Sequence, residues 1–117
     1  MKLIEIINLS QNLKTFIDKG IVLPYPVARA LSKNYTLFSD EIKIFEEERK
    51  KIVGDKNIES LTDNEKNEIN IKFEELLNAD IDIDFNRYDE NLLDGCSAEI
   101  SVKDMILLEY FMTTKDN

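Results

Sequence analysis

The chain has 117 residues, a formal net charge of −9, 43% hydrophobic and 33% charged residues, which is typical of one globular domain and not of a disordered segment. It contains no histidine and one cysteine, Cys96. An intramolecular disulfide is therefore excluded, and the commonest general base and zinc ligand are missing. No apolar run approaches the roughly 20 residues of a membrane-spanning helix, and no signal peptide is evident. We therefore expect a cytoplasmic protein without membrane association.

Apolar residues at helical spacing predict a first helix from about Leu3 to Lys19, which Gly20 ends. The opening sequence KLIEII also fits a short strand, because its apolar residues match either period. Pro24 and Pro26 lack backbone N–H donors and bias the residues before them to extended geometry, so they are predicted to lie in a connector.

The clearest element is a long helix predicted from about Pro26 to Val53. Its apolar positions recur after four and three residues in turn, a heptad-like seam typical of one helix packing lengthwise on another. Only Arg49 interrupts the seam, and its aliphatic stem can lie along it. The seam consists of Leu31, Tyr35, Phe38, Ile42, Phe45, Arg49 and Ile52.

A third helix is predicted to begin after Thr62, because Thr62 and Glu65 have the spacing of a capping box. Its apolar stripe comprises Ile69, Phe73, Leu76 and Leu77. A short polar turn joins this helix to the long one, so an antiparallel helical hairpin is expected.

The spacing of apolar residues changes at 80–86, where apolar and polar residues alternate strictly from Asp80 to Asn86. This pattern predicts a half-buried strand with Ile81, Ile83 and Phe85 facing inward and the aspartates facing water. A lone strand leaves its hydrogen bonds unmet, and its partner is either 98–101 or 21–23.

A last helix is predicted to start at Ser101, which has Asp104 at the position of the usual glutamate or glutamine of a capping box. Its inward face carries Met105, Leu108, Phe111 and Met112, and 113–117 is expected to be a frayed tail. The predicted fold is mainly α with a minor β element near 80–86. It is a single domain over 1–117, in which the long hairpin and two further helices bury a four-helix core.

The negative charge is concentrated in one part of the sequence. Residues 74–109 contain eleven acidic and two basic residues, whereas the rest of the chain has 13 of each sign. The negative electrostatic field of this region repels nucleic acid phosphate, so direct nucleic acid binding is not expected. It can attract a basic protein surface, although acidic residues also serve solubility alone.

This charge pattern predicts a partner-binding region in the strand and the loop after it. Tyr88 is included as an exposed aromatic anchor, because tyrosine is enriched at binding hot spots. The predicted partner-binding residues are Asp80, Asp82, Asp84, Arg87, Tyr88, Asp89, Glu90 and Asp94.

No catalytic residue, metal site or cofactor is predicted. The Asp80, Asp82 and Asp84 triplet resembles the start of an EF-hand loop, but Phe85 and Asn91 occupy the positions where that loop needs glycine and glutamate. Neighbouring glutamates on the long helix lack a cleft in which their pKa values could diverge. Cys96 has acidic neighbours and no base to activate it. We therefore do not expect an enzyme.

The order of elements resembles a family of small proteins of unknown function from tailed phages and prophages of low-GC bacteria. The resemblance spans most of the chain. It depends on Leu23-Pro24, Ala28 and Ala30-Leu31, Phe45 to Arg49, Glu75 to Asn78 leading into Asp80 to Phe85, and Ser101 to Met112 with Leu107-Leu108-Glu109. At the start of the last helix, relatives often have Ser-Pro-Ala-Glu where this chain has Ser101-Val102-Lys103-Asp104. The resemblance implies a viral origin and location in a bacterial cytoplasm, and it assigns no site residues.

Two functions follow as expectations. The first is a stoichiometric, anti-CRISPR-like inhibitor that covers the basic surface of a host defence protein with the acidic region. The alternative is a virion assembly factor or minor structural protein that forms a homo-oligomer through its long helix. An apolar stripe outside the main seam, formed by Val27, Leu37 and Ile44, motivates the alternative.

Overall fold

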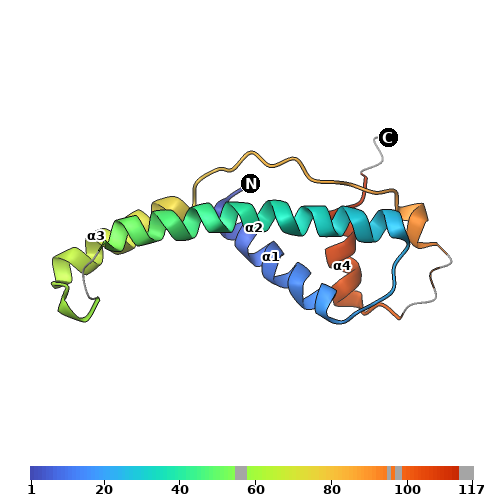
Figure 1. The fold of residues 1–117 in the computed structure, drawn as a ribbon, viewed down its shortest axis with the longest axis horizontal. Coiled ribbons are helices and arrows are strands. Elements are labelled where there is room, and N and C mark those ends of the chain that lie inside the picture. The colour runs from blue at the N-terminus through green and yellow to red at the C-terminus, as the bar shows by residue number, and fades with distance from the viewer. Residues whose placement is uncertain (55–57, 95, 97–98, 114–117) are drawn as a thin grey trace.

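A computed structural model describes residues 1–54, 58–94, 96 and 99–113 of the chain (Figure 1). The fold is mainly helical, as the sequence predicts, and elongated, with principal extents of 59 × 32 × 22 Å and a Cα radius of gyration of 18.2 Å. A compact domain of this length has a radius of gyration of about 13 Å. The difference arises because the far half of one long helix extends with a second helix as an arm (Figure 1).

The first two helices lie close to their predicted positions. Helix α1 spans Leu3–Asp18 and α2 spans Tyr25–Val53. The alternative of a strand at the N-terminus is wrong, because Leu3 and Ile6 are both buried on the inner face of α1. Gly20 and Gly54 end the two helices with φ near 66°, a conformation that glycine adopts without steric cost.

Helix α2 has two halves with different surroundings. All of its buried residues lie in the first half, between Val27 and Phe38. Helix α2 contacts both α1 and α3, and α3 lies along its far half (Figure 1). The predicted seam therefore changes character along the helix. Leu31 and Phe38 are buried, Arg49 is exposed, and Tyr35, Ile42, Phe45 and Ile52 are half-buried.

The apolar stripe predicted outside this seam does not form an exposed surface. Val27 is fully buried and Leu37 is half-buried, which leaves only Ile44 mostly exposed. The physical reason is that Val27 lies four residues before Leu31, so it shares the buried side of α2 with the start of the seam.

Helix α3 (Asp63–Leu77) runs antiparallel to the far half of α2, which confirms the predicted hairpin (Figure 1). The capping box is also confirmed. The Glu65 N–H donates to the Thr62 hydroxyl over 3.2 Å, and the Thr62 N–H donates to the Glu65 carboxylate over 3.3 Å. The turn between the helices includes a 3₁₀ segment, η1 (Ile58–Ser60).

The predicted four-helix core is wrong in one respect. The structure describes all of α3, and none of its residues is buried. The apolar stripe of α3 is only half-buried, because the arm has two helices and no third layer. Leu61 is buried at the tip. We call α3, η1 and residues 40–53 of α2 the arm, and the remainder the body.

The body is closed by α4 (Val102–Tyr110), which begins as predicted. Ser101 caps the helix, and its hydroxyl accepts from the Asp104 N–H over 3.1 Å. The Asp104 carboxylate pairs with the Lys19 ammonium at 2.6 Å. This ion pair joins the end of α1 to the start of α4.

Residues 79–89, which we call the strap, cross the body over α2 from the arm to the far end (Figure 1). The predicted alternation is confirmed up to Phe85, since Asp80, Asp82 and Asp84 are exposed and Ile81, Ile83 and Phe85 are half-buried. The predicted strand is not formed. The strap makes only isolated bridges, antiparallel between Lys2 and Asp80 and parallel between Tyr88 and Met112.

Of the two predicted partners of the strand, 21–23 is irregular and is not bridged to the strap, whereas 98–101 begins outside the described residues. The strap lies over a helix, whose backbone groups are already hydrogen-bonded within it, so bridges form only where chain ends approach. Of the predicted frayed tail, only Thr113 is described, and its N–H donates to the Tyr88 carbonyl over 2.8 Å.

Candidate functional site: the acidic strap

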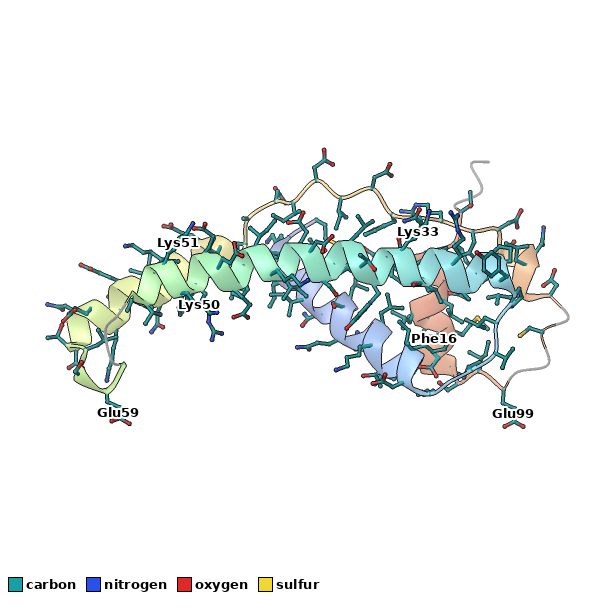
Figure 2. All side chains as sticks on the ribbon, in the orientation of Figure 1. Phe16, Lys33, Lys50, Lys51, Glu59 and Glu99 are labelled. Carbon is teal, nitrogen blue, oxygen red and sulfur yellow. The ribbon has the colours of Figure 1, made fainter. Side chains whose placement is uncertain are left out.

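The predicted site residues do not form one cluster. The carboxylates of Asp80, Asp82 and Asp84 stand along the solvent side of the strap, and consecutive ones are about 6.5 Å apart along an extended backbone. Figure 2 shows side chains that end in oxygen pointing from the strap away from α2. This row is a linear array of negative charge, which we call the carboxylate row.

The strap is held at its first end by the N-terminus of the chain. The Ile81 N–H donates to the Met1 carbonyl over 2.7 Å, and the Met1 ammonium donates to the Ile81 carbonyl over 3.2 Å. The Leu3 N–H donates to the Ala79 carbonyl over 3.0 Å. These bonds fix the strap where it leaves the arm.

The second attachment is Asn34, a fully buried residue of α2. Its side-chain carbonyl accepts from the Asn86 N–H over 2.7 Å, and its side-chain amide donates to the Asn86 carbonyl over 2.9 Å. The side chain of Asn34 therefore binds both backbone groups of one residue, as a neighbouring strand would. Sequence reasoning missed this role, because a lone asparagine on a helix resembles a surface residue.

Between these attachments the strap backbone has no partner. In the part of the chain that the structure describes, the N–H and C=O groups of residues 82–85 form no hydrogen bond. The position of residues 82–85 therefore depends on the attachments at the two ends of the strap and on the packing of Ile83 and Phe85.

The prediction that Tyr88 is an exposed anchor is wrong. Its side chain is 4% exposed, and its hydroxyl donates to the Leu108 carbonyl over 2.7 Å. Its N–H also donates to the Phe111 carbonyl over 3.2 Å. Burial raises the pKa of Tyr88 well above its usual range. Tyr88 thus joins the strap to α4 and cannot contact a partner.

The remaining predicted residues have different roles. Arg87 is exposed, but its guanidinium donates to the carbonyls of Tyr110 and Met112 over 3.3 and 3.2 Å and lies over the Phe85 ring at 5.6 Å. It therefore neutralises the C-terminal end of α4. Asp89 caps a 3₁₀ turn, η2 (Glu90–Leu93), by accepting from the Asn91 N–H over 3.0 Å.

Glu90 and Asp94 lie at the two ends of η2 and are exposed. The predicted region thus contains the carboxylate row, a second acidic corner at η2, and two residues, Arg87 and Tyr88, whose contacts are structural.

Replacing Tyr88 by phenylalanine should cost about 1–2 kcal/mol in unfolding free energy, because the Leu108 carbonyl loses its buried donor.

The wild-type protein should also lose stability as the pH rises above 10, the ordinary tyrosine pKa. There the unfolded chain releases the Tyr88 proton while the folded chain retains it. Below pH 10 both states retain the proton, so the stabilisation that comes from the raised Tyr88 pKa is fully present. Urea unfolding at pH 8 to 11 should show a shallower decline for Tyr88→Phe, and equal slopes would contradict this assignment.

Sequence reasoning also missed a groove between α1 and α4, of about 280 Å³. Its apolar lining includes Leu9, Ile106 and Leu107, and the Lys19–Asp104 ion pair lies at one end. The hydrogen bond from Lys19 is the main reason that the pKa of the Asp104 carboxyl lies below its ordinary value. The sequence signal was present, because α4 has apolar residues outside its predicted inward face.

Among the described residues, no group of three or more histidine, cysteine, aspartate or glutamate side chains is placed to hold a metal ion. Cys96 is half-buried, with its thiol 3.9 Å from the Val22 carbonyl. No helix in the described ranges combines the length and apolar character needed to cross a bilayer.

No protein-family model, curated protein or solved structure matches this chain. Its function must therefore be inferred from its own geometry and charge.

Proposed function

We propose that this protein is a non-catalytic binding module that holds a basic surface of another protein with its carboxylate row. The observation that carries this proposal is the exposure of Asp80, Asp82 and Asp84 at alternate positions of a strap attached at both ends. Because the strap is already ordered, little conformational entropy is lost on binding. A flexible acidic loop would lose more.

Charge defines the class of partner. The row lies within residues 74–109, which contain the whole excess of negative charge in the chain. Such a field accelerates association with a basic surface and disfavours nucleic acid. The basic surface that best matches a linear array of negative charge is one that itself binds a nucleic acid strand. The proposed action is therefore stoichiometric inhibition, and the phage resemblance makes a host defence nuclease the proposed target.

The test compares two variants of equal charge. Replacing Asp80, Asp82 and Asp84 by lysine changes the net charge from −9 to −3, since each reversal adds two. The control replaces Asp40, Glu47 and Glu68, three exposed residues of the arm, in the same way and also gives −3. Each tagged protein is used to capture partners from host lysate, with elution along a salt gradient.

A basic protein that is retained by the wild type and the arm variant, lost by the strap variant and released as salt rises would support the proposal. For the captured protein, the association rate at low salt should fall at least tenfold for the strap variant only. Equal binding and equal salt dependence for the strap variant and the wild type would overturn it.

The alternative of self-assembly through the long helix has lost its main motivation, because Val27 is buried in the body. Recovery of phage structural proteins only from infected lysate would restore an assembly role.

A further inference from the structure

Helix α4 has a second apolar face that the described chain leaves largely exposed. Leu108 and Phe111 point into the body and are fully buried. On the other side, Val102, Ile106 and Tyr110 are 80%, 63% and 42% exposed. Residues four apart lie on one side of a helix, so these three form a continuous row, which we call the α4 row.

The α4 row continues onto the neighbouring helix. Ile106 and Tyr110 also line the groove between α4 and α1, together with Leu9 and Leu107. The exposed apolar surface is therefore wider than three side chains, and contiguous exposed apolar surface of this kind marks interaction sites in soluble proteins.

We propose that the α4 row binds a second copy of this chain, with the two α4 helices parallel about a two-fold axis. This inference goes beyond the proposed function, because it involves a different surface. The observation that selects a second copy is the placement of charge beside the row. Lys103 and Glu109 are exposed, and neither forms an ion pair within the described residues.

The two charges lie on opposite flanks of the row. Each is three residues from Ile106, which places Lys103 about 60° to one side of it and Glu109 about 60° to the other. When two copies pair in parallel, each flank brings Lys103 of one copy and Glu109 of the other to the same side, about 9 Å apart along the axis. Long side chains can bridge this offset, as interhelical pairs in parallel coiled coils do.

An antiparallel pair has the opposite consequence. Each flank would then hold two lysines or two glutamates, which repel one another. The charges of α4 are therefore self-complementary only in the parallel arrangement. Because α4 has nine residues, the contact is small, and a weak, concentration-dependent dimer is expected.

Sedimentation of the full chain over a range of concentrations tests the contact. The wild type should dimerise, and Ile106→Glu should raise the dimer dissociation constant at least tenfold. The matched control is Ile71→Glu, which places the same charge at a 49% exposed isoleucine of α3 and should leave the constant unchanged. A wild type that stays monomeric at every concentration, or equal effects of both substitutions, would overturn the proposal.

Charge exchange tests the orientation. Lys103→Glu and Glu109→Lys should each weaken the dimer, and the double exchange should restore it. Neither change opposes the helix dipole, since the first adds a negative charge near the N-terminus of α4 and the second a positive charge near its C-terminus. Failure of the double exchange to restore the dimer would overturn the parallel arrangement.

A cysteine cross-link provides an independent measure. With Cys96 replaced by serine, Val102→Cys should form a disulfide-linked dimer, because the parallel axis brings the two residues at this position together. Tyr110→Cys with Val102→Cys in separate chains should cross-link poorly, whereas an antiparallel pair would reverse these results and contradict the proposal.

Discussion

Phe38→Ala is expected to lower the unfolding free energy by about 3–5 kcal/mol, the usual cost of removing a buried phenylalanine. Phe38 is fully buried and is the last buried residue of α2. Its ring contacts Phe85 of the strap and Phe111 after α4, with centroids 5.5 and 6.2 Å away. The substitution therefore leaves a cavity where three segments meet. Urea-induced unfolding followed by circular dichroism measures the cost.

The matched control is Phe45→Ala, two turns further along the same helix. Phe45 is half-buried and lies in the arm, where solvent already reaches the seam. Its removal should cost less than about half as much, because a site open to water loses less transfer free energy and leaves no closed cavity. Equal costs would show that the arm is packed as tightly as the body.

These two phenylalanines show how far the sequence predicts the fold. Both belong to the same heptad-like seam, and the periodicity correctly predicts that both face another element. Helix positions and the capping residues Thr62 and Ser101 are also predicted correctly, because they depend on neighbours within a few residues. The loss of burial after Phe38 depends on segments distant in sequence, so a local pattern cannot reveal it.

The carboxylate row shows the same limit within the candidate site. Alternation predicts the exposure of Asp82 and Asp84, because a half-buried extended segment must place successive side chains on opposite sides. Continued to residue 88, the same alternation places Tyr88 outside, yet it is buried. The alternation ends at Asn86, whose backbone is bound by Asn34.

Asn34→Ala should therefore destabilise the protein by about 2–4 kcal/mol, although it removes only a small polar side chain. The substitution leaves the N–H and C=O groups of Asn86 without the partners that they have at 2.7 and 2.9 Å, and an unsatisfied buried polar group costs about 1–3 kcal/mol. It should also free the strap, so amide hydrogens of residues 86–88 should exchange faster than in the wild type.

The control for Asn34→Ala is a substitution of its hydrogen-bond partner, Asn86. Asn86→Ala removes only the side-chain contact to the Asn34 carbonyl at 3.3 Å and retains both backbone bonds, so its cost should stay below about 1 kcal/mol. If the two substitutions cost the same, the pairing of Asn34 with the backbone is not what holds the strap. If Asn34→Ala alone is severe, the carboxylate row owes its fixed position to a buried amide of α2. The same variant should then bind a basic partner more weakly than the wild type, although every carboxylate remains.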